Sequence, residues 1–156
     1  MTSNGGDERR IVLATGNPGK AGELETLLRG LPVQCVLLRE LAGGLDVPEP
    51  FATFVENAAY KARFAARLGR EWALGEDSGL DVDAMAGRPG VYSARFAGHR
   101  RPDSERVGLL LNMMMDVPPA RRTGRFHCAL ALASPEGLLG QWHGLCEGRI
   151  AEAPRG

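Results

Sequence analysis

The apolar residues of this chain gather into short runs, and turn-forming residues separate these runs from one another. Runs at residues 10–15, 32–38 and 71–75 are brief and largely uninterrupted. Such runs are typical of strands that are buried in a sheet. The first half of the chain therefore predicts three strands, with longer segments between them.

Helical patterns fill those longer segments. Asn17 followed by Pro18 is typical of a helix start, and Thr53 with Glu56 three residues later forms a capping-box pattern. Each pattern ends at a glycine, which favours a helix end. We expect these apolar faces: Leu24, Leu27 and Leu28 in the first helix, and Phe54, Ala58, Ala62, Ala65 and Leu68 in the second.

The second half of the chain has a different order of elements. Residues 77–79 read Asp-Ser-Gly and predict a turn, with Ser78 capping a short helix. A further helix is expected from Ser104, and residues 125–133 and 138–146 predict a hairpin. Strands first alternate with helices and then follow one another. This order predicts an α/β fold with a central mixed β-sheet flanked by helices.

Composition narrows the class of protein. Of the 156 residues, 44% are hydrophobic and 24% are charged, which is typical of a globular domain and excludes a disordered chain. Nineteen basic residues balance nineteen acidic ones. Nucleic-acid binders are usually basic, so this balance argues against a nucleic-acid partner. Three cysteines without paired spacing argue against a disulfide framework and for a reducing compartment.

Residues 1–10 are polar and lack the apolar segment of a signal peptide, so we expect a disordered tail there. A single domain is expected from residue 11 to residue 156. No apolar run approaches the ~18 residues that a membrane span needs. The sequence therefore predicts no membrane partner and a cytoplasmic location.

A candidate phosphate site lies between the first strand and the first helix. A helix N-terminus offers N–H groups and the positive end of the helix dipole, and glycines allow close approach to phosphate oxygens. Lys20 opposes the dipole, which favours an anion site over the alternative of a surface lysine. The spacing excludes a Walker A loop. The residues of the candidate site are Thr15, Gly16, Asn17, Pro18, Gly19 and Lys20.

A second candidate is acidic. Glu76 and Asp77 follow the third predicted strand, and strand ends in α/β sheets commonly face ligands. Carboxylates gathered there suit Mg²⁺, which binds one or two of them together with phosphates. Asp81 and Asp83 fit better as residues of a helical first turn. Glu49 could reach the same edge, and its alternative role is a solvated loop charge.

Other candidates are weaker. The cysteines and histidines lack zinc-ligand spacing, and His127 and Cys128 would face opposite sides of a strand. They are expected to be core or half-buried residues. Lys20 and Lys61 are the only lysines of the chain, a scarcity that compositional bias could explain.

Four ordered segments resemble the inosine triphosphate pyrophosphatase family: VLATGNPGKAGEL, TFVENAAYKAR, GEDSGLDVDAMAGRPGVYSARFAG and RFHCALAL. The resemblance runs from residue 11 to residue 156. It implies an elongated, two-lobed α/β fold, commonly a homodimer. It also implies Mg²⁺-dependent hydrolysis of the non-standard purine nucleoside triphosphates ITP, dITP and XTP to monophosphate and pyrophosphate.

The resemblance also implies roles for single residues. Asp77 matches the family's proton acceptor and Mg²⁺ ligand, and Glu49 matches a second acidic metal position. Ser78 matches a substrate-contacting position, and the segment from Thr15 to Lys20 matches the phosphate-binding segment. The substrate is then a small nucleotide.

The family pattern continues beyond Gly156, so the resemblance implies a C-terminally incomplete, truncated domain and leaves base selectivity open. Two rival functions stay open as well. One is a Maf-type nucleotide pyrophosphatase that acts on other bases. The other is a nucleotide-binding module without turnover.

Overall fold

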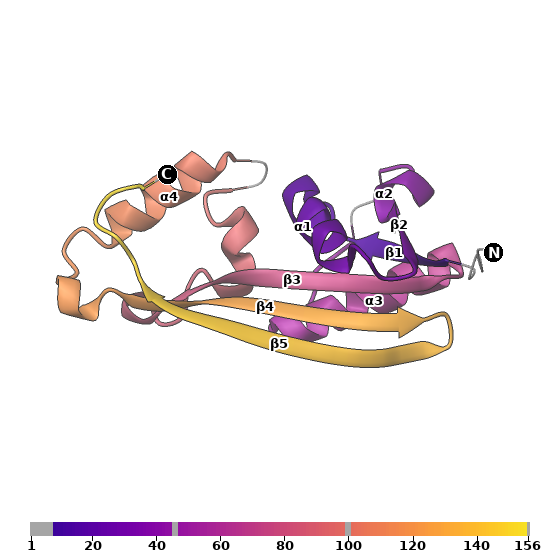
Figure 1. Cartoon of the computed structure of the whole chain (residues 1–156). Coiled ribbons are helices and arrows are strands. Elements are labelled where there is room, and N and C mark those ends of the chain that lie inside the picture. The colour runs from indigo at the N-terminus through magenta and orange to yellow at the C-terminus, as the bar shows by residue number, and fades with distance from the viewer. Residues whose placement is uncertain (1–7, 45–46, 99–100, 156) are drawn as a thin grey trace. The chain divides into compact units, whose positions relative to one another are not determined.

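The computed structural model describes residues 8–44, 47–98 and 101–155. In this part of the chain, five strands form one sheet in the order β2-β1-β3-β4-β5, with helices beside it (Figure 1). The strands are β1 (Arg9–Ala14), β2 (Val33–Leu37), β3 (Trp72–Val82), β4 (Thr123–Ser134) and β5 (Gly137–Arg149). The α-helices are α1 (Pro18–Leu28), α2 (Leu38–Leu41), α3 (Phe54–Gly69) and α4 (Asp103–Met113). Short 3-10 helices are η1 (Asp83–Met85), η2 (Gly90–Arg95) and η3 (Pro119–Arg121).

The sheet is mixed, as the sequence predicts. Strand β1 pairs in parallel with β2 on one side and with β3 on the other. A two-residue turn joins β4 to β5, which makes this pair an antiparallel hairpin. The α/β fold class is therefore confirmed.

The chain divides into two compact units. The first comprises residues 1–77 and 129–142, and the second comprises residues 78–128 and 143–156.

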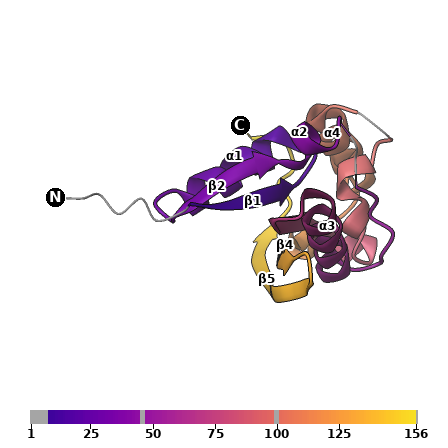
Figure 2. The same cartoon turned by 90° about the vertical axis from the view of Figure 1, so that its right-hand side faces the viewer.

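In the first unit, opposite faces of β1 pack against different helices. Ile11 and Leu13 form a core cluster with Leu24 of α1. The Cβ position of Gly69 in α3 lies 3.1 Å from a methyl group of Val12, whose side chain points to the other face. Figure 2 shows α1 and α3 on either side of β1. This packing places the N-terminus of α1 and the inner face of α3 around the carboxyl end of β1.

The second unit has its own small core. Val82, Met85 and Met114 are buried there, with Leu110 and Ile150 packed against them. These side chains join the end of β3, η1, α4 and the segment after β5.

A buried arginine ties the same elements together. The Arg122 guanidinium donates hydrogen bonds to the carbonyl oxygens of Met114 at 2.6 Å, Ile150 at 3.1 Å and Ala151 at 2.9 Å. It thereby satisfies a carbonyl just beyond α4, where such groups have no partner within the helix.

Several expectations from the sequence are wrong. Residues 77–79 do not turn, because β3 continues to Val82 and Ser78 is a strand residue. Pairing between neighbouring strands supplies the backbone hydrogen bonds there, and it overrides the local turn preference. Leu27 and Leu68 are 75% and 48% exposed, although both fit an apolar stripe.

The third error concerns the predicted tail at residues 1–10. Arg9 and Arg10 belong to β1, where Arg9 pairs with Val33 of β2. Residues 1–7 of that tail lie outside the described residues.

Candidate active site

The loop between β1 and α1 has the local structure that the sequence predicts. The Asn17 side chain caps α1, because its Oδ1 accepts hydrogen bonds from the N–H groups of Gly19 at 2.9 Å and Lys20 at 3.3 Å. The N–H of Asn17 donates to the Thr15 hydroxyl at 3.2 Å. Pro18 is the first residue of the helix. The Asn17 side chain thus occupies two of the helix N–H groups. The helix dipole and the Lys20 ammonium remain as the features of this loop that attract an anion.

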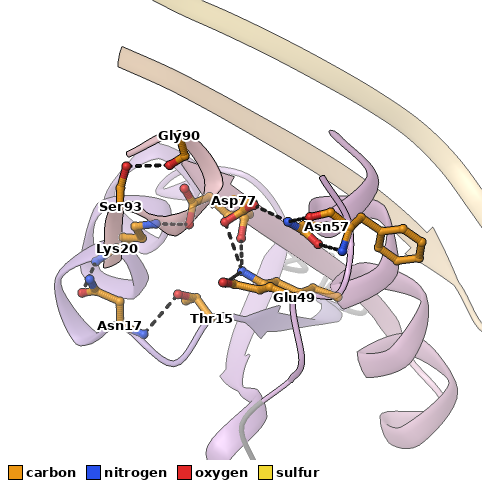
Figure 3. A network of polar contacts seen from close by, with 11 residues as sticks. Thr15, Asn17, Lys20, Glu49, Asn57, Asp77, Gly90 and Ser93 are labelled. Carbon is orange, nitrogen blue, oxygen red and sulfur yellow. Dashed lines mark hydrogen bonds and ion pairs between the residues drawn. The ribbon is translucent and has the colours of Figure 1, made fainter. Parts of the chain in front are cut away.

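The parallel register between β1 and β3 brings the acidic pair to this loop. The last matched pair is Ala14 with Gly75, so Glu76 and Asp77 lie just past the carboxyl end of β1. The Lys20 ammonium lies 3.0 Å from Glu76 Oε2 (Figure 3). Asp77 is therefore a mid-strand residue. It lies beside the β1–α1 loop because the neighbouring strand β1 ends before β3 does.

Helix α3 supplies two further polar side chains. Lys61 is buried and places its ammonium 3.0 Å from the Glu76 carbonyl oxygen and 3.5 Å from Asp77 Oδ1. The same ammonium pairs with Glu49 (Figure 3). The Lys61 ammonium therefore joins the carboxylate of Asp77 in β3 to that of Glu49, which precedes α3.

Asn57 fixes the orientation of the Asp77 carboxylate. Its side-chain N–H groups donate to Asp77 Oδ2 at 3.0 Å and to the Phe51 carbonyl at 3.2 Å. Its Oδ1 in turn accepts a hydrogen bond from the Phe51 N–H at 2.9 Å. The amide is fully buried and bonded at both ends, so it connects Asp77 rigidly to the loop that carries Glu49.

Burial raises the pKa of Asp77 above 3.8, the ordinary value. The Lys61 ammonium opposes this effect, the Glu49 carboxylate adds to it, and Asn57 and Lys20 lower the pKa. The ion pairs of the described residues join three carboxylates to two ammonium groups here. These five groups together carry a net negative charge, which suits a cation.

The structure brings most of the predicted site residues together. Thr15, Asn17, Lys20, Glu49 and Asp77 gather in the first unit (Figure 3). Gly16 lies in the β1–α1 loop, and Pro18 and Gly19 are the first residues of α1. Ser78, the next strand residue after Asp77, is half-buried and belongs to the second unit. The functional roles of all these residues stay predictions.

Asp81 and Asp83 are not part of this cluster. Asp83 begins η1, as expected for a helical first turn, and pairs with Arg125 at 3.0 Å. Asp81 is a strand residue instead and lies 3.1 Å from His127 Nε2. Its predicted place in a helix was wrong, because β3 extends through it.

Sequence reasoning missed Asn57 and Lys61. Both occupy the apolar stripe of α3, where Phe54, Ala58 and Ala62 are buried. A polar residue on such a stripe is buried and needs a buried partner. This position, together with the scarcity of lysine, could have identified both side chains.

The donor set fits a magnesium ion better than a metal held by protein alone. The described residues contain no group of three or more His, Cys, Asp or Glu placed to hold one ion. Mg²⁺ needs only one or two carboxylates when phosphates and water complete its shell. Asp77 and Glu49 supply such carboxylate oxygens beside a loop that suits an anion.

Comparison with known proteins gives a consistent result. The model of the Ham1 family matches residues 11–156. A protein of Desulforamulus reducens named dITP/XTP pyrophosphatase is 45% identical over 94% of this chain and 73% of its own length. A Geobacillus kaustophilus protein of the same name is 44% identical over 95% of this chain and 72% of its own.

Solved structures of similar proteins give the same result. A HAM1 protein from Coxiella burnetii has a TM-score of 0.83 and 39% identity, and the match covers 95% of this chain and 76% of that one. A Mycobacterium abscessus protein described as nucleoside-triphosphatase and dITP/XTP pyrophosphatase has a TM-score of 0.77 and 37% identity, covering 94% and 75%. No helix in the described part of the chain has the length and apolar character to cross a bilayer.

Proposed function

The chain belongs to the Ham1 family, and from this premise we propose that it hydrolyses non-standard purine nucleoside triphosphates to monophosphate and pyrophosphate. Its relatives are named for dITP and XTP, and ITP shares the same 6-oxo purine edge. The observation that carries the proposal is that the strand residues Glu76 and Asp77 lie beside the capped end of α1, where Lys20 pairs with Glu76. Removal of such nucleotides from the pool is the role that follows.

The β1–α1 loop binds the triphosphate in this proposal. Lys20 reaches from the first turn of α1, and its ammonium lies 3.0 Å from the Glu76 carboxylate. The ammonium and the positive end of α1 attract the phosphate oxygens. Donors that are already in place stabilise charge that develops as pyrophosphate leaves.

Asp77 accepts the proton of the attacking water. Asn57 and Lys61 hold its carboxylate in one orientation, and burial raises its pKa towards the operating pH. Both conditions suit a general base. Asp77 and Glu49 would hold Mg²⁺, which supplies charge neutralisation on phosphate and activation of water when bound.

Pyrophosphate release tests the function. We expect release from ITP, XTP and dITP in Mg²⁺, and little release when EDTA replaces the ion. Faster pyrophosphate release from dTTP than from any of the purine nucleoside triphosphates would favour the Maf-type alternative. Heat of binding in titration calorimetry without any product would instead identify a binding module.

Lys20→Ala is expected to raise the KM for the triphosphate by about 10- to 100-fold, which corresponds to the 1.5–3 kcal/mol of a hydrogen bond to a charged group. The exposed Arg39 of α2 offers a matched control, because Arg39→Ala also removes one cation but from a different helix. The measurement is KM for ITP beside the affinity for IMP. An equal loss for both nucleotides would show that Lys20 does not contact the β- or γ-phosphate.

The activity is expected to fall in acid as Asp77 becomes protonated. Because burial raises its pKa, the acid limb of kcat/KM for ITP should lie above pH 3.8, the ordinary aspartate value. A profile from pH 4 to pH 9 measures this limb. A flat profile down to pH 4 would contradict a base with a raised pKa.

Two further proposals rest on the family resemblance. We propose a homodimer, which light scattering after gel filtration can test. We also propose a cytoplasmic location, where the nucleotide pool lies. Fractionation of cells that express the chain tests the second proposal.

A further inference from the structure

A second polar cluster lies in the second unit, built from residues outside the proposed active site. His127 of β4 and His143 of β5 face each other, and His127 Nδ1 lies 3.0 Å from His143 Nε2. The rings stack at a centroid distance of 5.2 Å and an angle of 20°. On its other side, His127 Nε2 lies 3.1 Å from Asp81 Oδ2. The three side chains thus form one chain of polar contacts from β3 to β5.

The Asp81 carboxylate favours one tautomer of His127. An ionised carboxylate only accepts hydrogen bonds, so its 3.1 Å contact with Nε2 favours the neutral ring that is protonated on Nε2. The lone pair of that neutral ring is then on Nδ1, which faces His143. The backbone of Asp81 is itself fixed by a bridge to Pro89. A carboxylate that holds a histidine in this way is the usual outer partner of a metal-binding imidazole.

The separation of the two facing nitrogens suits one metal ion. Metal–imidazole bonds are about 2.0–2.1 Å long. Two such bonds at a right angle place the nitrogens about 2.9 Å apart, and a tetrahedral angle places them about 3.3 Å apart. The observed 3.0 Å lies within this range. His143 is exposed and His127 is half-buried, so an ion can reach both rings from solvent.

The neighbouring charges favour a cation. Arg125 pairs with Asp83 at 3.0 Å and with Glu147 at 2.9 Å, which neutralises its guanidinium. Asp81 is a third carboxylate, and it contacts His127. These three carboxylates and one guanidinium together carry a net negative charge, which favours a cation at the neutral histidines.

From this geometry we propose a transition-metal site in which His127 Nδ1 and His143 Nε2 bind one divalent ion such as Ni²⁺, Cu²⁺ or Zn²⁺. Asp81 orients His127 without touching the ion. The described residues offer no third His, Cys, Asp or Glu ligand, so water completes the coordination. Imidazole favours these ions, whereas Mg²⁺ favours oxygen, so the site does not compete for the ion of the proposed reaction.

Titration calorimetry of the full chain, stripped with EDTA, tests the proposal with Ni²⁺ and Zn²⁺ as probes. We expect one ion per chain, and an increase in Tm because the ion binds only the folded chain. His143→Gln should weaken binding at least tenfold, and Asp81→Asn should weaken it about 10- to 100-fold, the usual effect of an outer partner. Circular dichroism checks that each variant is folded.

The third histidine of the chain provides the matched control. His99→Gln also removes one imidazole, and it should leave the affinity for Ni²⁺ and Zn²⁺ unchanged. Mg²⁺ should give no heat at this site. Absence of Ni²⁺ and Zn²⁺ binding would overturn the proposal and leave the pair as a proton-sharing hydrogen bond. Binding that survives His143→Gln, or that is lost with His99→Gln, would also overturn it.

Discussion

Asp77→Asn is expected to lower kcat for ITP hydrolysis by about 10²- to 10⁴-fold, the usual loss when a general base is removed. The amide keeps the size of the side chain but cannot accept the proton of water. It also removes a negative charge that would face Mg²⁺. Asn57 and Lys61 still surround the position, so the fold should persist.

Steady-state kinetics at saturating Mg²⁺ measure this loss. The matched control is Asp116→Asn, because Asp116 is exposed in the second unit and should tolerate the change with full activity. Near-normal turnover of the Asp77 variant would remove this residue from the mechanism. Loss of circular dichroism signal would instead indicate a structural role.

The same substitution has a predictable effect on stability. Because burial raises the pKa of Asp77 in the folded chain, ionisation of this carboxyl opposes folding. This loss of folding free energy is absent below the pKa that Asp77 has in the unfolded chain, because the carboxyl is then protonated in both states. The loss is complete above the raised pKa that Asp77 has in the folded chain. The free energy of unfolding of the Asp77→Asn variant should therefore rise relative to that of the parent chain as the pH increases from 4 to 7. Denaturant titrations at each pH measure this difference. A catalytic residue that lowers stability is a common trade-off.

The parts of the site that the sequence predicts are local ones. The Asn17 cap of α1 and the Thr53 cap of α3 depend on residues two or three positions apart, and the structure contains both. The Glu56 carboxylate accepts its hydrogen bond from the Thr53 hydroxyl. The short strand β1 could be predicted too, because it is apolar along most of its length. The sequence assigns Asp77 to the end of the third strand, but β3 continues to Val82 and Asp77 lies in its middle. Its position beside the β1–α1 loop depends on where β1 ends, which is a property of the register.

The rest depends on contacts between distant segments. Lys61 lies twelve residues from Glu49 and sixteen from Asp77, so no local pattern connects them. The turn predicted at residues 77–79 failed for the same reason, because neighbouring strands satisfy that backbone. The His127–His143 pair likewise requires the register of the hairpin between β4 and β5. The sequence analysis found no zinc-ligand spacing among the histidines and cysteines, because the two histidines meet only when β4 and β5 pair.

Gly75→Ala is expected to destabilise the first unit by about 3 kcal/mol, the upper end of the range for overpacking. A Cβ atom at this position would lie 2.2 Å from the carbonyl oxygen of Ala58 and 2.6 Å from the N–H nitrogen of Ala62. Both atoms belong to the backbone of α3 and cannot rotate away. Strand β3 would have to move from the helix, so Tm should fall by roughly 6–12 °C.

The displacement should also reduce activity, because Gly75 directly precedes Glu76 and Asp77 while their partner Lys61 lies on α3. A shift of about 1 Å at a catalytic group can cost 10²-fold in rate. Gly22→Ala is the matched control, since nothing lies within 4 Å of its Cβ position in α1. That variant should gain roughly 0.5–1 kcal/mol from helix propensity and keep its activity. Equal thermal stability of the two variants would show that β3 and α3 can separate without cost, and that their close contact does not position Asp77.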